Sequence, residues 1–240
     1  MADSRDALLS TVLVDTLAAA AVIGFFWLAI LWMRGFGKKA GYSLAPLGFS
    51  RPRGGILAGI GAGVAVGAGT VLLSVIVNPI SFLVLERLGY STESTIQKPF
   101  MQGLVRWVQE SPDAAIPAIV LVVVLFGPAV EELIFRGAIF NGLYRLGTMV
   151  SARFVGTEHY EGPLSKTTFV SSALASSMLF ALAHLEPVFL PVLLILAITL
   201  CALFQRTGSL LPPFVAHATF NSFVAALLIL RGLNILHFQI

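Results

Sequence analysis

Two adjacent carboxylates and an arginine lie inside the most apolar neighbourhood of the chain. The stretch VVVLFGPAVEELIFRGAIF runs from Val122 to Phe140 and carries Glu131, Glu132 and Arg136. An ionised side chain at the middle of a bilayer costs about 2.5–3.5 kcal/mol on insertion scales, so such residues are functional candidates when they face the interior of a helix bundle. Glu132 and Arg136 are four residues apart and can pair on one helix face. Glu131 lies about 100° around the helix from Glu132 and presents a second carboxylate to a neighbouring surface.

Two further polar pairs stand in apolar segments, each with one helical turn between its members. FALAH places Phe180 before His184, and HATFN places His217 before Asn221. With the two glutamates they make a set of groups suited to hydrolysis. A carboxylate can take a proton from water, and an imidazole can hold the same water. An imidazole with a carboxamide can donate hydrogen bonds to a developing oxyanion.

The same residues allow a metal-dependent alternative. Two histidines and a glutamate match a known zinc ligand set, here Glu131, His184 and His217. The HExxH helix of many zinc proteases is absent, because the two histidines lie on separate expected helices. No GxSxG nucleophile elbow occurs, and Cys201 stands in an apolar run as a buried filler. We therefore expect no cofactor, with zinc as the alternative.

Other functions remain open from these residues. Intramembrane charges also serve ion- or proton-coupled transporters, although no inverted repeat of the kind found in secondary transporters is visible. A protein without enzymatic activity, acting as an immunity or scaffold protein, is a further alternative. The presence of the complete set of polar groups argues against it.

The composition indicates what must position these groups. The 240 residues are 57% hydrophobic and 11% charged, whereas soluble domains carry about 25% charged residues. The chain is therefore expected to be all-α, a polytopic transmembrane helix bundle of about six spans, with room for broken or re-entrant helices and one interfacial helix. The partners expected are the lipid bilayer and a peptide or protein substrate. The net charge of +3 gives no reason to expect nucleic acid.

Six apolar segments are long enough to span the bilayer, and we expect them to form one domain over residues 1–240. They cover about 8–33, 55–84, 115–135 with a helical extension, 168–184, 188–205 and 212–230. The segment 34–53 carries Arg34, Lys38, Lys39, Arg51 and Arg53 and no acid.

That segment and 136–167, which is also rich in basic residues, are predicted to be cytoplasmic by the positive-inside rule, and both termini then lie outside. The positive charges that follow Glu132 predict a water-filled cavity open to the cytoplasm.

Three local patterns refine the expected helices. Glycines at 55, 59, 63 and 67 share one helix face and favour close helix packing. Asn78-Pro79 is expected to kink or end the second span. The segment KPFMQGLVRWVQESPDAA places Phe100, Leu104 and Trp107 on one side and is expected to be an amphipathic connector or interfacial helix.

The expected spans create one conflict. If 168–184 and 188–205 were straight antiparallel spans, His184 and His217 would lie roughly 20 Å apart. A shared site then requires helices that tilt, break or start deep, and Leu185-Glu186-Pro187 and Leu211-Pro212-Pro213 are the expected breaks.

Taken together, EExxxR, FxxxH and HxxxN in this order resemble the CPBP family of intramembrane proteases. That family contains the type II CAAX prenyl endopeptidases and the bacteriocin-processing or self-immunity (Abi-type) proteins. The phrase TGSLLPPFVAHATFN from Thr207 to Asn221 is similar to the last block of the family. The resemblance covers about residues 115–230, which would form the catalytic core.

The resemblance implies an intramembrane endopeptidase without a covalent intermediate. Glu131 would be the general base, and His184 would help to hold the water. His217 and Asn221 would form the oxyanion site.

By the same resemblance, Glu132 and Arg136 would order the helix, while Phe180 would pack beside the site. The family name suggests a lipidated substrate, but no prenyl pocket is recognisable in the sequence. We expect the plasma (inner) membrane as the location, with the site facing the cytoplasm.

Overall fold

The computed structural model describes residues 47–93, 97–156 and 163–237, together with scattered helical positions between residues 6 and 27. Most of the first expected span, 8–33, and the basic residues Arg34, Lys38 and Lys39 lie outside the described residues.

The described part of the chain is helical and contains no strand, which confirms the all-α prediction. Among the described residues, five helices are long and apolar enough to cross a membrane, so the chain is an integral, multi-pass membrane protein. The elements are α2 (Ile56–Arg87), α3 (Gln97–Glu110), α4 (Pro112–Ile119), η2 (Val120–Phe126), α5 (Gly127–Glu132), η3 (Leu133–Phe140), α6 (Asn141–Val155), α7 (Pro163–Ala183), α8 (Leu190–Thr207) and α9 (Leu211–Gly232).

The elements from α4 to α6 form one continuous helix, Pro112–Val155, of 44 residues. At 1.5 Å per residue it is about 66 Å long, roughly twice the thickness of a bilayer core. Its turns are widened to the π form in η2 and in η3, on either side of the short α5 segment. Arg136, expected to begin the polar segment 136–167, is instead fully buried inside the bundle.

The glycine stripe of α2 packs against the start of α9. Gly59, Gly63 and Gly67 are buried, and a Cβ on Gly63 would lie 2.7 Å from the carbonyl oxygen of Pro212. Gly55 precedes the helix as its N-cap and contacts nothing in this way. The helix continues through Pro79 to Arg87, so of the two expected outcomes, a kink or an end, Asn78-Pro79 does not end the span.

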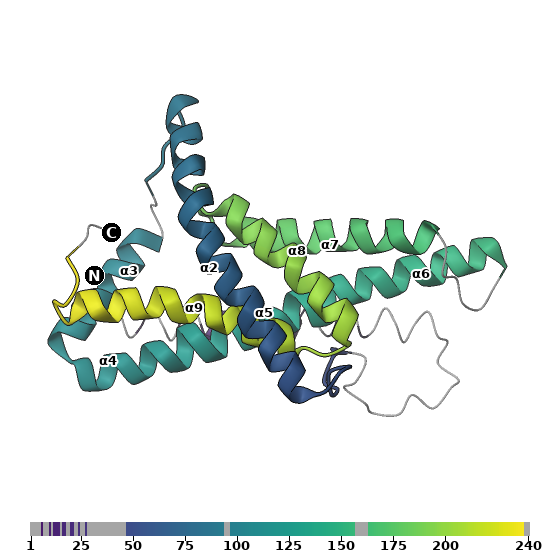
Figure 1. The fold of residues 1–240 in the computed structure, drawn as a ribbon, viewed down its shortest axis with the longest axis horizontal. Helices are drawn as coiled ribbons and strands as arrows, with labels where there is room; N and C mark the ends of the chain where they lie inside the picture. The colour runs from purple at the N-terminus through teal and green to yellow at the C-terminus, as the bar shows by residue number, and fades with distance from the viewer. Residues whose placement is uncertain are drawn as a thin grey trace.

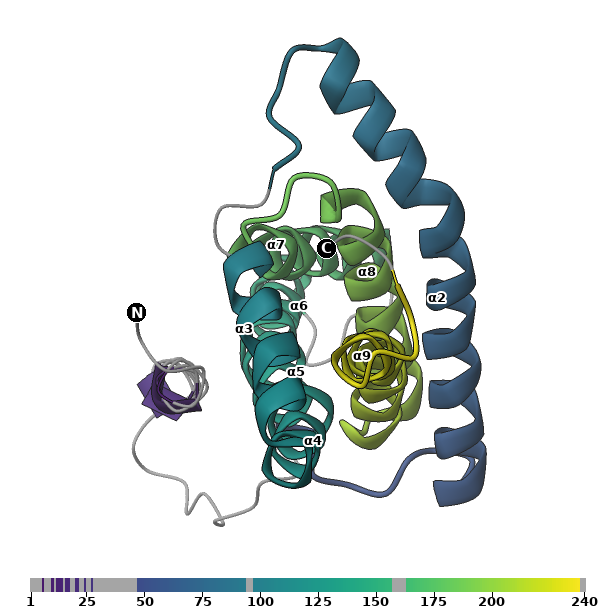
Figure 2. The same cartoon turned by 90° about the vertical axis from the view of Figure 1, so that its left-hand side faces the viewer.

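Helices α2 and α8 run obliquely across α6, α7 and α9, as Figures 1 and 2 show. Because α8 crosses the bundle obliquely, His217 in the second turn of α9 reaches Phe180 of α7, with ring centroids 5.5 Å apart. Pro212 and Pro213 fall in the first turn of α9 and begin that helix instead of breaking it.

The connector before the long helix is the amphipathic helix α3. Leu104, Val105 and Val108 are buried in a core shared with α4 and α9, and Phe100 and Trp107 pack at its edge.

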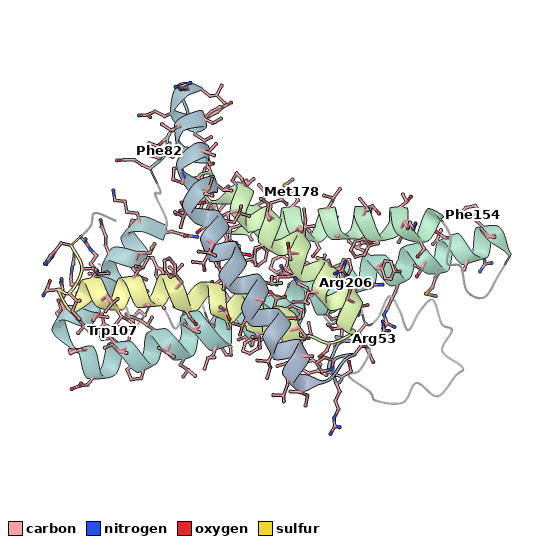
Figure 3. All side chains as sticks on the ribbon, viewed as in Figure 1. Arg53, Phe82, Trp107, Phe154, Met178 and Arg206 are labelled. Carbon is pink, nitrogen blue, oxygen red and sulfur yellow. The ribbon has the colours of Figure 1, made fainter. Side chains whose placement is uncertain are left out.

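The outer surface of the molecule is apolar as well (Figure 3). Phe82, Met178 and Phe154 are 41%, 43% and 85% exposed, as expected for side chains whose solvent is lipid.

Candidate active site

The two adjacent glutamates lie in α5, and their surroundings differ. The Glu132 side chain is 1% exposed, whereas the Glu131 side chain is 24% exposed. The wide π turns on both sides set how this short segment faces its neighbours, and such turns are frequent at functional sites.

Glu132 pairs with Arg136, as their spacing predicts. Arg136 Nη1 donates to Glu132 Oε1 at 2.8 Å, and both side chains are 1% exposed. Arg136 Nη2 lies 3.5 Å from the carbonyl oxygen of Ala197 in α8. The guanidinium lies 4.6 Å from the ring centroid of Phe180, an arrangement that stabilises a cation when water is excluded.

His217 reaches both glutamates from α9. Its Nδ1 is 2.9 Å from Glu132 Oε1, within hydrogen-bonding distance. Its Nε2 is 3.8 Å from Glu131 Oε2, too far for a direct hydrogen bond. Glu132 therefore fixes the orientation of the ring and directs Nε2 toward Glu131, as carboxylates commonly do for functional histidines.

Phe180 packs between the two histidines and is fully buried. Its ring centroid is 4.7 Å from that of His184 and 5.5 Å from that of His217. Phe135 completes the packing at 5.2 Å. The two imidazoles thus share one neighbour, and the roughly 20 Å separation expected for straight antiparallel spans does not occur.

His184 lies just after α7, where the chain turns. Its Nδ1 is 2.8 Å from the Phe180 carbonyl oxygen. Its own carbonyl oxygen accepts a hydrogen bond from Gln97 Nε2 of α3 at 3.0 Å. The next residue, Leu185, has φ 54°. This left-handed backbone conformation is rare for residues other than glycine and asparagine.

Asn221 contacts the long helix. Its Nδ2 donates to the carbonyl oxygen of Val123 in η2 at 3.0 Å. π-Helical segments shift the i→i−4 pattern and leave carbonyls open to other donors. The carboxamide therefore joins α9 to the segment that precedes the glutamates.

Several buried polar atoms of this cluster have no hydrogen-bond partner in the described structure. They are Glu131 Oε2, Glu132 Oε2 and Arg136 Nε. Buried polar groups are normally satisfied by protein or by ordered water. Since the Glu131 oxygen faces His217 Nε2, the arrangement suits a water molecule between them.

The zinc alternative requires Glu131, His184 and His217 to converge on one point. Among the described residues, no group of three histidine, cysteine, aspartate or glutamate side chains is placed so that it could hold a metal ion. His217 Nδ1 is engaged by Glu132, and His184 Nδ1 by a backbone carbonyl, which leaves Nε2 of each ring as the nitrogen available to another group. The choice between a metal-free site and zinc stays a prediction.

Cys201 lies near this cluster but does not join it. It is buried, and its Sγ is 3.8 Å from Ser177 Oγ.

Gln97 and Val123 make two contacts with site residues that the sequence did not predict. Each reaches its partner across about ninety residues of chain, and neither carries a local signal.

The segment that carries this cluster is similar to known proteins. Residues 113–223 match the family model described as type II CAAX prenyl endopeptidase Rce1-like. A Bacillus subtilis (strain 168) protein named "Putative membrane peptidase YdiL" is 30% identical over 110 residues, which cover 46% of this chain.

The match spans 37% of that relative's length. No solved structure matches the chain. Glu131, Phe180, His184, His217 and Asn221 all fall within the matched segment. The match confirms the resemblance of the three motifs: residues 113–223 are similar to the type II CAAX prenyl endopeptidase Rce1-like family.

Proposed function

We propose that this protein is an intramembrane endopeptidase that hydrolyses a peptide bond with a water molecule activated by Glu131. One observation carries the proposal. A buried, unpartnered oxygen of Glu131 faces Nε2 of His217 at 3.8 Å. The family match adds that proteins with this domain include membrane endopeptidases.

In the proposed first step, a water molecule lies between Glu131 Oε2 and His217 Nε2. With Nδ1–H directed at Glu132, the neutral ring offers a lone pair at Nε2. The water can then donate one hydrogen to each group, which leaves an oxygen lone pair free to attack the substrate carbonyl carbon. Glu131 takes the proton as the C–O bond forms and later gives it to the leaving nitrogen.

Glu132 and Arg136 position this arrangement and do not touch the substrate in the proposal. Glu132 holds His217 through Nδ1, and Arg136 balances the charge of Glu132. A buried carboxylate without such a partner would be costly.

His184 and Asn221 are assigned by the resemblance to the water and to the oxyanion. We retain both as proposed supporting groups at the edge of the site. The geometry supports a water-holding role more directly for His217 than for His184, because His217 faces Glu131. An oxyanion role for His217 would require a proton on Nε2.

The proposed substrate is a membrane-associated protein or peptide, cleaved near its membrane-embedded end. The cluster has apolar surroundings inside a membrane helix bundle. A substrate that is already in the membrane can reach such a site as an extended peptide. A lipid attached to the substrate remains a prediction from the family. We further propose that the site opens to the cytoplasm from the plasma membrane.

The test uses purified protein in liposomes with a library of internally quenched apolar peptides. Wild-type protein should cleave members of the library, and Glu131→Gln should not, while both show the same thermal unfolding temperature. Metal analysis and chelator treatment run in parallel. Loss of cleavage with 1,10-phenanthroline and its return with zinc would contradict the metal-free mechanism. Proton or ion flux without any cleavage would contradict the enzyme.

A further inference from the structure

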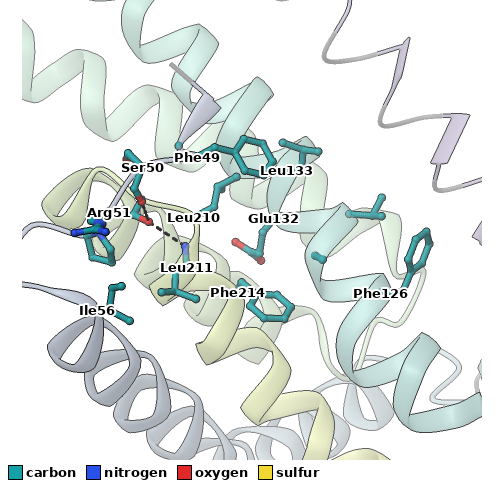
Figure 4. A pocket seen from close by; sticks show the side chains of 15 residues that line it. Phe49, Ser50, Arg51, Ile56, Phe126, Glu132, Leu133, Leu210, Leu211 and Phe214 are labelled. Atoms are coloured by element: carbon teal, nitrogen blue, oxygen red, sulfur yellow. Dashed lines mark hydrogen bonds between the residues drawn. The ribbon is translucent and has the colours of Figure 1, made fainter. Parts of the chain in front are cut away.

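A cavity of about 660 Å³ lies beside Glu132, outside the cluster that holds the two histidines. Its walls come from the segment before α2, from the long helix and from the start of α9, as Figure 4 shows. The lining is apolar apart from a few groups, and includes Phe49, Ile56, Phe126, Leu133, Leu211 and Phe214. Pockets of this size can hold a small ligand or part of a larger one.

Three arginines lie on or next to the chain segments that line this cavity. Arg51 lines it. Arg53 N donates to the Thr207 carbonyl oxygen at 2.9 Å, and its guanidinium lies against Gly208. Arg206 stands in the last turn of α8, at the same end of the molecule as Arg53 (Figure 3). We call Arg51, Arg53 and Arg206 the arginine rim.

The arginine rim is exposed and has no acidic partner. All three side chains are exposed to solvent. Within the described residues, none of them forms an ion pair with a carboxylate. The rim is therefore a concentration of positive charge that is available to an anion.

The position of the rim along the spans indicates where that anion would be. Arg51 and Arg53 come directly before α2, and Arg206 comes one residue before the end of α8. The backbone bond between Arg53 and Thr207 ties these two span ends together. Ends of membrane spans lie at the level of lipid headgroups, and basic pockets there bind anionic headgroups.

The cavity runs from this level along apolar walls. Phe49 and Ile56 line it and are 54% and 47% exposed, so it is open to the surroundings of the bundle. In a bilayer those surroundings are hydrocarbon, and an apolar cavity open to them favours an acyl chain.

We infer that this site binds an anionic phospholipid, with the phosphate on the arginine rim and one acyl chain in the cavity. Free phosphate would satisfy the rim alone and leave the apolar walls unused. The bound chain would exclude water from the side of Glu132 that lines the cavity. The inference does not depend on proteolysis and can be measured on the Glu131→Gln protein as well.

The experiment measures lipid binding by native mass spectrometry of detergent-purified protein titrated with phosphatidylglycerol. A rim variant carries Arg51→Gln, Arg53→Gln and Arg206→Gln. A matched control carries Arg87→Gln, Arg106→Gln and Arg153→Gln, three exposed arginines away from the cavity, so the net charge is equal. A third variant, Ala129→Phe, fills the cavity from a lining position without changing charge.

Wild-type and control proteins should bind one phosphatidylglycerol molecule tightly. The rim variant should bind roughly a hundred-fold more weakly, since each basic residue contributes about five-fold. Ala129→Phe should also weaken binding, phosphatidylcholine should bind poorly, and inorganic phosphate at equal concentration should not displace the lipid.

Three results would overturn the inference. The first is equal loss of affinity in the rim and control variants, which would mean that only net charge matters. The second is unchanged binding in Ala129→Phe, which would leave the chain outside the cavity. The third is an Ala129→Phe protein that keeps its lipid but loses peptide cleavage, which would assign the cavity to the substrate.

Discussion

Glu131 and Glu132 are adjacent in sequence but have different partners. Glu132 is enclosed by Arg136 and His217, at 2.8 and 2.9 Å. Glu131 has a partly exposed side chain and one buried oxygen without a hydrogen-bond partner. Glu132 is therefore held by two partners, whereas Glu131 keeps an oxygen available for the proposed reaction.

This contrast predicts that the same change, Glu to Gln, lowers the cleavage rate at one position and the stability at the other. Glu131→Gln should lower the rate of peptide cleavage by about 10²- to 10⁴-fold, the usual contribution of a general base, without lowering thermal stability. Glu132→Gln should lower stability by about 3–5 kcal/mol, because it leaves the charge of Arg136 buried without a carboxylate.

Differential scanning fluorimetry and the peptide assay measure the two effects separately. Glu110→Gln, at an exposed carboxylate outside the site, is the control for loss of a negative charge. A stable Glu132→Gln protein, or an unstable Glu131→Gln protein, would contradict the division of roles.

The polar members of the cluster could be identified from the sequence, because charges and imidazoles in apolar helices are costly and therefore conspicuous. Its spacing also predicted the pairing of Glu132 with Arg136. The contact of Glu132 with His217 was not predictable, since it joins residues 85 positions apart through a helix crossing that no local pattern specifies.

Among the elements, α2 and α9 approach each other through glycines that have no room for a side chain. A Cβ on Gly63 would lie 2.7 Å from a backbone oxygen of α9 and 2.8 Å from Val215 Cβ. Backbone oxygens cannot move aside as a flexible side chain can.

Gly63→Ala should therefore destabilise the protein by about 1–3 kcal/mol through overpacking. Gly61→Ala, two residues away on the same helix with nothing within 4 Å of its Cβ, should leave stability unchanged or raise it slightly, since alanine favours helix over glycine. Thermal unfolding in one detergent compares the pair. Equal effects would show that helix propensity, and not the α2–α9 contact, is being measured.

Helix α3 reaches the end of α7 through Gln97, whose side chain holds the His184 carbonyl oxygen. Gln97→Ala should lower kcat for peptide cleavage about ten- to hundred-fold, because a small displacement of an active-site group can cost this much. The KM should change little, since the proposal gives Gln97 no contact with the substrate.

Gln102→Ala, at an exposed position of the same helix, should leave both constants unchanged. An effect of Gln97→Ala on KM alone would assign Gln97 to substrate binding. Equal kcat in all three proteins would show that His184 needs no such support.

Within the described residues, five of the six expected spans were predictable to within a few residues, apart from the length of the helical extension to Val155, because hydropathy and length decide which segments can cross a bilayer. Their crossing angles were not. The oblique course of α8 depends on packing between side chains that are distant in sequence, and it brings together two histidines that straight spans would separate.

The positions of Arg53, Arg206 and Arg87 predict how the whole molecule is oriented in the membrane. Arg53 and Arg206 lie at one end of their spans, and Arg87 ends α2, 32 residues of helix away. That helix is about 48 Å long, so its two ends face opposite sides of the bilayer.

Single-cysteine labelling checks the orientation, since the native Cys201 is buried and should react slowly. Arg53→Cys and Arg206→Cys should be labelled by a membrane-impermeant maleimide in inverted vesicles, and Arg87→Cys in right-side-out vesicles. Wild-type protein provides the background in both preparations. Labelling in the reverse preparations would contradict the positive-inside prediction.

The two π-helical segments make the direction of the glutamates sensitive to the number of residues before them. Each residue of an α-helix turns the chain by about 100°, and the wide turns of η2 lie directly before α5. Deleting one valine from Val122–Val124 would let η2 tighten to the α form and would leave α5 near its present direction, because the wide turns hold about one extra residue. Deleting two of these valines would rotate α5 relative to α4 by about a quarter turn. The Glu131 carboxylate would then face away from His217, with every proposed catalytic residue still present. Loss of two residues from this helix is therefore expected to be as damaging as loss of the proposed base.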